Sequence, residues 1–364
     1  MTSEANVRGA FRIQEHYCRT MDAPIYARLC TAIADGLTRD HAIGRRLLDW
    51  SGEPTKDALP LRFIGGLHAL VRAGADAGLA AVFAGDVTAP EAIAGVLDRV
   101  CAEHHAALDP WLDGPPQTNE PGRSAALILG LAAVAARATP RLEVLEIGSS
   151  GGLNLQIDRY RFVLGGVALG PEESPVTITP EWRGPPPEIA PFEIVSTRGC
   201  DVNPLDVTDP AVAARLAAYV WPETPERLAR LERAIAMLRA RPVDLARADA
   251  ADWLEARLAE PQEAGVTRVL MHSVVWQYLP EAVADRVRAA MAAAGARASG
   301  ERPLAWVAME PNRAFAQMLL SVRVWPGAAA REIIAHCHAH AAWIEPGPPG
   351  PSEAGAPSGA KIEL

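Results

Sequence analysis

Glycine and serine residues that follow a short apolar stretch form the pattern best suited to hold a ligand. The segment Val144–Leu153 reads VLEIGSSGGL, with Gly148, Ser150 and Gly152 at alternate positions. Small residues permit a tight turn and let the backbone approach a ligand at the carboxyl end of a strand. The acidic residue Glu146 suits a ligand that carries an ammonium group and would repel a pyrophosphate. We therefore expect S-adenosylmethionine at these cofactor-binding residues in preference to NAD.

The same residues also resemble two other patterns. The dinucleotide pattern GxGxxG fails, because Ser150 stands at its second glycine and Leu153 at its third. The hydrolase pattern GxSxG is met, with Ser150 as nucleophile and His272 or His336 as base. That nucleophile normally follows several strands, whereas the region before residue 142 is expected to be helical, and no HGGG-like segment is present. An α/β-hydrolase is kept as an alternative.

Polar residues also end three of the later expected strands. Asp201 would accept hydrogen bonds from both ribose hydroxyls of a nucleoside cofactor, and Asp249 would face the adenine amino group. His272, in the segment VLMHSVV, is a candidate catalytic base. Each has a structural alternative: Asp201 caps a turn, Asp249 begins a helix, and His272 is a buried histidine with internal partners.

The elements that would position these residues change character near residue 140. From Val7 to about Arg137 apolar residues recur at helical spacing, which predicts an all-helical domain over residues 1–137. Residues 138–344 alternate strands with helices, which predicts an α/β domain with a Rossmann-like, mostly parallel sheet and an antiparallel terminal hairpin. We expect strands at Leu142–Ile147, Phe192–Thr197, Val243–Ala246, Arg268–Met271 and Leu304–Met309, helices at Leu153–Tyr160, Ala211–Tyr219, Pro225–Arg239, Asp252–Ala259 and Glu281–Ala294, and the hairpin at Met318–Trp325 and Arg331–Ile344. Residues 345–364 are rich in Pro, Gly and Ser and predict a flexible tail.

Composition and charge argue against several classes of protein. Hydrophobic residues make up 49% of the chain and charged residues 22%, which is typical of a globular protein. The net charge of −9 disfavours nucleic acid and anionic membranes as partners. The longest apolar run, Ala125–Ala136, has 12 residues, whereas a membrane span needs about 20. The five cysteines form no CxxC pair and the first residues form no apolar signal segment, so we expect a reducing cytoplasm.

Alternating histidines near the C-terminus suggest a metal site. His336, His338 and His340 would share one face of a strand, as the ligands of a transition metal do. No carboxylate or cysteine of suitable spacing joins them, and Cys337 would point to the opposite face. We therefore predict a histidine-lined strand surface and no metal.

Longer stretches of the sequence resemble known families. The region from about Leu142 to Ile344 resembles class I S-adenosylmethionine-dependent methyltransferases, whose sheet ends in an antiparallel strand. The chain up to about residue 345 resembles an uncharacterised bacterial family of unknown function with a methyltransferase-like half. The segments that carry this second resemblance are PPQTNEPGRSA from Pro115, EIGSSGGLNL from Glu146, DRYRF from Asp158, DVNPLDVTDP from Asp201, VWPETPERLARL from Val220 and HSVVWQYLP from His272.

The methyltransferase resemblance implies methyl transfer from S-adenosylmethionine to a small or medium-sized acceptor. In that fold the chain entering the first strand passes over the methionine end of the cofactor. Arg123 would then pair with the cofactor carboxylate, Asn119 would bind the acceptor, and Glu120 would be a second candidate base. An ordinary helical ion pair between Glu120 and Arg123 is the structural alternative. A methyltransferase-like scaffold without activity is a further alternative, because a fold does not fix a function.

The spacing of the first two strand ends departs from the methyltransferase plan. Asp201 follows Glu146 by 201 − 146 = 55 residues, where a Rossmann-type unit has about 20. Residues 161–191 are therefore expected to form an inserted arm or lid. Within it, Glu172 or Glu173 competes with Asp201 for the ribose contact.

Overall fold

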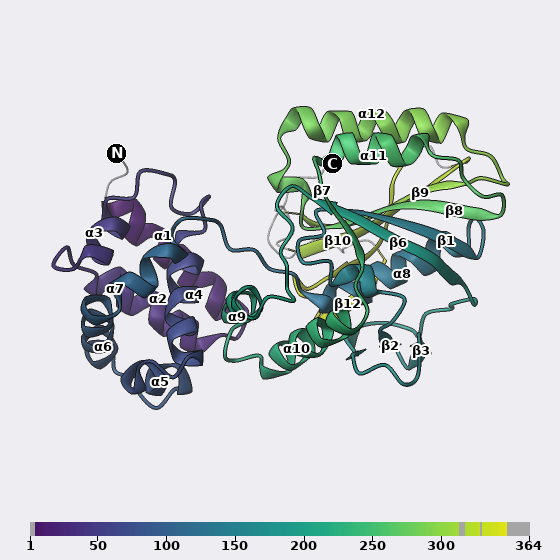
Figure 1. Ribbon diagram of the computed structural model, residues 1–364. Helices are drawn as coiled ribbons and strands as arrows, with labels where there is room; N and C mark the ends of the chain where they lie inside the picture. Colours follow the sequence, from purple (N-terminus) through teal and green to yellow (C-terminus); the bar gives the residue numbers. More distant parts are fainter. Residues whose placement is uncertain (1–3, 313–316, 328–329, 348–364) are drawn as a thin grey trace, which may run out of the picture. The chain divides into compact units, whose positions relative to one another are not determined.

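The computed structural model describes residues 4–312, 317–327 and 330–347, and these pack into two compact units (Figure 1). The first unit holds the described residues up to Thr118 together with Asp209–Ala229. The second holds Asn119–Thr208 and the described residues from Arg230 onward. The chain thus leaves the sheet-containing unit after residue 208 and returns to it at residue 230.

The first unit is built from helices around an apolar core. Its largest buried side chains include Tyr26, Phe63 and Leu67, which are at most 1% exposed. Proline begins several of these helices, at a position where its missing N–H costs no hydrogen bond, and Asp76 caps α5 by accepting from the Leu79 amide. The helices are α1 Glu4–Thr20, α2 Pro24–Gly36, α3 Ala42–Leu48, α4 Leu59–Arg72, α5 Ala77–Ala84, α6 Pro90–Glu103, α7 His105–Leu108, η1 Asp109–Trp111 and α9 Pro210–Ala218, followed by the start of α10 Pro225–Ala240.

The second unit contains a nine-stranded, mostly parallel sheet, which confirms the α/β class of the sequence prediction. Its strand order is β5-β12-β11-β10-β9-β8-β1-β6-β7. Strands β7, β6, β1, β8 and β9 are parallel, and β10, β11 and β12 continue the sheet as antiparallel neighbours. The bounds are β1 Arg141–Ile147, β5 Glu181–Trp182, β6 Glu193–Asp201, β7 Asp244–Arg247, β8 Val266–Ser273, β9 Leu304–Asn312, β10 Gln317–Trp325, β11 Glu332–Cys337 and β12 Trp343–Pro346.

The order of the parallel strands reverses between β1 and β8. From β1 the chain proceeds to β6 and β7 on one side, and then returns to β8 and β9 on the other. At such a reversal the connections leave in opposite directions, so a crevice opens at the carboxyl ends of the two strands. The carboxyl ends of β1 and β8 hold the Gly148 bend and His272, respectively.

Helices cover the two faces of the sheet. Helices α11 Ala250–Ala259 and α12 Glu281–Arg297 pack together over one face, and α8 Ser124–Ala135 packs on the other face against β9 and β10 (Figure 1). Helix α8 approaches the sheet closely at Gly130, where an added Cβ would lie 2.5 Å from Val307 Cγ1. The expected boundary near residue 137 therefore differs from the observed division, because α8 buries its apolar surface against the sheet.

The connection from β1 to β6 differs from the prediction. The helix expected at Leu153–Tyr160 is replaced by a single 3-10 turn, η3 Asn154–Gln156. The Tyr160 hydroxyl donates to the Leu153 carbonyl at 2.6 Å, so the side chain takes an acceptor that a continuing helix would use. The inserted arm follows as a small sheet of β3-β2-β4, and β5 then pairs with β12 at the far edge of the large sheet. The small strands are β2 Arg161–Leu164, β3 Val167–Leu169 and β4 Thr177–Ile178.

The C-terminal strand is shorter than expected. Strand β11 ends at Cys337, a turn follows, and β12 begins at Trp343. His338 and His340 therefore do not continue the strand face of His336, and the prediction of three histidines on one strand is wrong. The expected tail at residues 345–364 falls, from residue 348 onward, outside the described residues.

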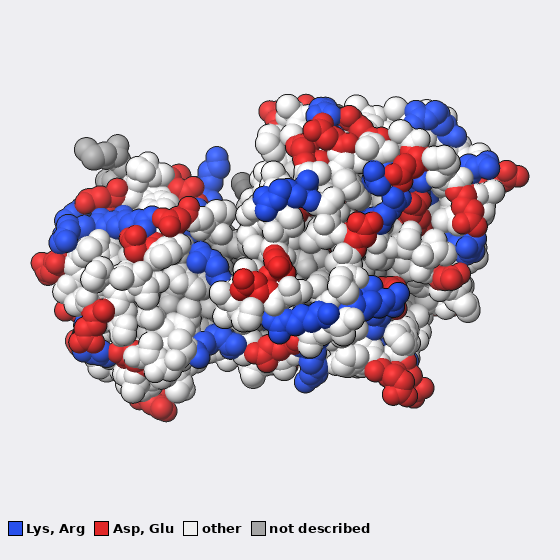
Figure 2. Space-filling model, viewed as in Figure 1, with Lys and Arg blue, Asp and Glu red and all other residues white. Residues whose placement is uncertain are grey.

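Two surface properties bear on the expected partners. Basic and acidic side chains are interspersed over the face seen in Figure 2. Among the described residues no single helix is both long and apolar enough to cross a membrane; α4 and α5 pass such a test only as a pair, and they are bent by 111° at their junction.

The close packing of α8 on the sheet gives a stability prediction. Gly130→Leu forces a side chain into the space of Val307 and is expected to lower stability by about 1–3 kcal/mol. The matched variant Gly95→Leu lies in α6 with nothing within 4 Å of its added Cβ, and should gain up to about 1 kcal/mol from helix propensity. Thermal unfolding midpoints of both variants test this, and equal midpoints would contradict the packing described.

Candidate functional site

Segments far apart in the sequence meet around the bend that follows β1. Asn119 Oδ1 accepts from the Leu153 amide at 2.8 Å, and Asp201 Oδ2 accepts from the Ser150 amide at 2.9 Å. A second link from the upstream segment joins Ser124 Oγ to Asn154 Oδ1 at 2.9 Å. The carboxyl edge of β1, β6 and β8, which we call the switch edge, is thus a built site rather than a loose loop.

Backbone strain marks both strand ends of this edge. Ser150 has φ +53° and Val274 has φ +54°, in the left-handed region that side-chain-bearing residues rarely adopt. The strain is greatest for Val274, because its side chain is β-branched. Gly148 and Gly152 also have positive φ, of 69° and 74°, which explains the need for glycine there. Strained residues on two neighbouring strands are typical of ligand-binding and catalytic sites.

The glycines of the bend are covered by apolar side chains of the same unit. An added Cβ would lie 2.2 Å from Val275 Cγ2 at Gly148 and 2.6 Å from Val207 Cγ1 at Gly151. At Gly152 the nearest atom is Val243 Cγ2, at 2.8 Å. Valine side chains of the same unit therefore fill the space beside these glycines. A ligand at this edge would meet side chains and backbone amides rather than the glycine Cα atoms.

Glu146 is the residue of the bend with the most unusual environment. Glu146 is only 1% exposed, and its Oε2 has no hydrogen-bond partner in the described structure. Burial and, more weakly, the charge of nearby Asp201 raise the pKa of Glu146 to about 7, against the opposing effect of hydrogen bonds from Ser149 and Asn154. One oxygen of the charged carboxylate, Oε2, therefore lacks a donor or a cation that would stabilise it.

His272 is placed at the expected edge but is sealed inside the protein. It is 0% exposed; Trp306 Nε1 donates to its Nε2 at 2.9 Å, and its Nδ1 lies 2.6 Å from Glu310 Oε1. Because the indole can only donate, Nε2 carries no proton and Nδ1 donates to Glu310. Both nitrogens are used, so the expected role of His272 as catalytic base is not supported by its geometry.

The two charged residues of the upstream segment also have internal partners. Glu120 Oε1 accepts from the Gly122 amide at 2.9 Å and pairs with Arg230 at 3.1 Å. Arg123 Nε donates to the Ala339 carbonyl at 3.0 Å. The expected base Glu120 is therefore half of an ion pair with Arg230.

The acids at the later strand ends act as caps in this structure. Asp201 accepts from the amides of Ser150 and Asn203 through different oxygens. Asp249 caps α11 by accepting from the Ala251 amide at 2.9 Å. Their structural interpretations therefore hold, although both oxygens of Asp201 and Oδ2 of Asp249 keep lone pairs for a further donor. The competing residues Glu172 and Glu173 are exposed in the inserted arm, between β3 and β4.

Ser150 has one property of a hydrolase nucleophile and lacks another. Its φ is positive and its buried Oγ has no hydrogen-bond partner in the described structure. A nucleophilic serine needs a base within hydrogen-bond reach. Of the two proposed bases, His272 is bound to Glu310 and Trp306, and His336 pairs with Glu345 at 3.3 Å.

Three residues important to this edge were missed by sequence reasoning. Glu310, at the end of β9, binds His272 and also accepts from the Val275 amide at 3.1 Å. It therefore fixes the segment that covers Gly148. An acid near the end of the next parallel strand is the same signal that identified Asp201, so Glu310 could have been found. Val274 and Trp306 offered no such signal.

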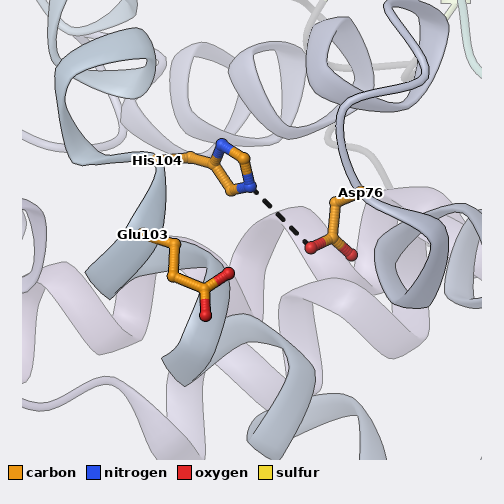
Figure 3. A group of neighbouring side chains, drawn as sticks. All are labelled: Asp76, Glu103 and His104. Atoms are coloured by element: carbon orange, nitrogen blue, oxygen red, sulfur yellow. Dashed lines mark ion pairs between the residues drawn. The ribbon is translucent and has the colours of Figure 1, made fainter.

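One group of metal-ligand type occurs in the helical unit. Among the described residues, Asp76, Glu103 and His104 bring three ligand atoms within 4.8 Å of one another (Figure 3). Arg99 already pairs with both acids, and its guanidinium lowers the pKa of Asp76 to about 2. The positive charge of Arg99, which is bound to both acids, is typical of an ion-pair network and would repel a metal ion.

The comparison with protein families identifies the chain. Residues 8–345 match the family described as uncharacterized protein conserved in bacteria (DUF2332). The chain belongs to this family. Searches of curated proteins and of solved structures each found no match.

The buried carboxyl of Glu146 predicts a pH-dependent stability. Its folded pKa of about 7 lies above its usual 4.5, so stability is highest when the group is protonated and falls as pH rises through about 7. Glu146→Gln removes this loss and should be more stable than wild type at about pH 8, by up to about 3 kcal/mol, with little difference at about pH 5. Denaturant midpoints across this range test the difference, and parallel pH curves would contradict it.

Proposed function

We propose that the chain is an S-adenosylmethionine-dependent methyltransferase that binds its cofactor at the switch edge. The observation that carries the proposal is the Glu146 carboxyl, buried at the bend with Oε2 unpartnered. A cation nearby would stabilise the charged carboxylate, and the ammonium group of S-adenosylmethionine is such a cation. A pyrophosphate cofactor would instead bring repulsion.

The sheet order supports a nucleoside ligand at this position. Strands β1, β6 and β8 end together at the reversal of the parallel order, which is where open α/β sheets bind cofactors. Asp201 would then meet the ribose hydroxyls with its remaining lone pairs. Val202, which is 74% exposed beside it, offers an apolar contact for the adenine ring.

The chain's part in the reaction is binding and positioning. When bound, the cofactor supplies a methyl group on a positively charged sulfur, which needs in-line approach of the acceptor. Glu146 would hold the ammonium group, and the unpartnered Ser150 Oγ would donate to the cofactor carboxylate. His272 and Glu120 are not retained as bases in this proposal, because both are bound to internal partners.

Calorimetry of the full chain with S-adenosylmethionine and its demethylated product tests this function. We expect binding in the micromolar range, weakened about tenfold or more in Glu146→Gln. Affinity should rise between about pH 6 and about pH 8, as Glu146 loses its proton, and the variant should lose this dependence. The control Glu301→Gln alters an exposed carboxylate, of 80% side-chain exposure, and should bind as wild type does.

Two outcomes would overturn the proposal. One is the absence of heat with both compounds at about 1 mM, which would favour a scaffold without a cofactor. The other is equal affinity of wild type and Glu146→Gln for S-adenosylmethionine, which would show that Glu146 does not contact the ammonium group.

The hydrolase alternative is tested separately, because the positive φ and free Oγ of Ser150 favour it. Under the methyltransferase proposal a fluorophosphonate does not label the wild-type chain, since no base activates Ser150. Labelling that disappears in Ser150→Ala would identify a serine hydrolase.

A further inference from the structure

A cavity of about 400 Å³ opens on the sheet face that carries α12, beside β9, β10 and β11. In a doubly wound sheet each parallel connection lays a helix on one face. Here β9, β10 and β11 follow one another as antiparallel neighbours, and the described residues between them form no helix. Alternate β10 residues from Leu319 to Trp325 therefore line an open wall. The cavity shares Trp306 with the residues described at the switch edge, and its other lining residues are distinct from them.

Arginine and tryptophan side chains dominate the lining. The Arg331 guanidinium stacks 4.3 Å from the Trp306 ring centre, and that of Arg323 lies 4.3 Å from the Trp325 ring centre. Arg288 completes the set from α12. Stacking on the Trp306 indole holds the Arg331 guanidinium in place while leaving its N–H edge available to an oxyanion.

The charge of the cavity is unbalanced. None of the described residues that line it is acidic, and Arg288 pairs with Asp285, outside the lining. Burial lowers the pKa of Arg331 to about 10; Glu310 opposes this shift, whereas the neighbouring Arg323 and Arg288 add to it. Among the described residues, Arg331 has no hydrogen-bonded or ion-paired acceptor. A half-buried cation surrounded by further cations is stabilised by an anion.

We propose that this cavity binds a small ligand with an oxyanion group, a phosphate ester or a carboxylate, attached to a flat apolar part. The guanidinium groups would hold the oxyanion in bidentate hydrogen bonds. The apolar part would lie against Trp306, Trp325 and Ile333. The volume suits a compound of the size of a substituted aromatic ring rather than a polymer.

Phenyl phosphate, benzoate and inorganic phosphate are the probes for the full chain. Two tryptophans line the cavity, so binding is expected to change tryptophan fluorescence as well as to release heat. Phenyl phosphate or benzoate should bind more tightly than inorganic phosphate, and the better of the two identifies the oxyanion. Affinity should fall with rising salt.

Arg331→Gln should weaken binding of the better probe by about tenfold or more, and Arg323→Gln provides a second variant on the neighbouring strand. The control Arg286→Gln lies on α12 but pairs with Asp252 and Glu255, and should bind within about twofold of wild type. Absence of binding to all three probes at about 10 mM, or unchanged affinity in both lining variants, would overturn the proposal.

Discussion

The architecture of the switch edge depends on one constraint: a left-handed bend after β1 that must be held by side chains from elsewhere. Ser150 and Val274 occupy strained backbone conformations, and such strain persists only where surrounding contacts over-determine it. The carboxylate of Asp201 and the amide oxygen of Asn119 supply those contacts by accepting from backbone amides of the bend. The upstream segment and the end of β6 are therefore fixed by the same bend that would bind a ligand.

A second constraint concerns buried charge. Both ring nitrogens of His272 are hydrogen-bonded, one to Trp306 and one to Glu310 Oε1, which also accepts from the Val275 amide. The second oxygen of Glu310, Oε2, has no partner among the described residues. Glu146 lies on the neighbouring strand β1, and its Oε2 has no partner among the described residues. Burial of this carboxyl raises its pKa. The contrast explains why Glu146, and not His272, is the residue from which a ligand is inferred. A satisfied buried group specifies the fold, whereas an unsatisfied one indicates a missing partner.

The sheet connections explain the other open feature of this unit. Helices cover both faces of the parallel strands. Helix α8 packs on one face of β10 and β11, and their other face is left open at the cavity. The inserted arm uses the far edge instead, where β5 pairs with β12. Arginine and tryptophan side chains lie on this open face. The antiparallel order of β9, β10 and β11 therefore accounts for the cationic cavity.

The sequence by itself determined the order and type of most elements, because the apolar periodicity of strands and helices is a local property. It predicted β1, β6, β7, β8 and β9 and the glycine bend, and it brought Asp201 and His272 to the correct strand ends. Only the tertiary structure decided what those side chains do. Asp249 caps a helix, His272 is enclosed by Glu310 and Trp306, and the expected helix after the bend is replaced by η3. The partners of His272 lie 38 and 34 positions away in the sequence, and burial and hydrogen bonding at that distance leave no periodic trace in the sequence.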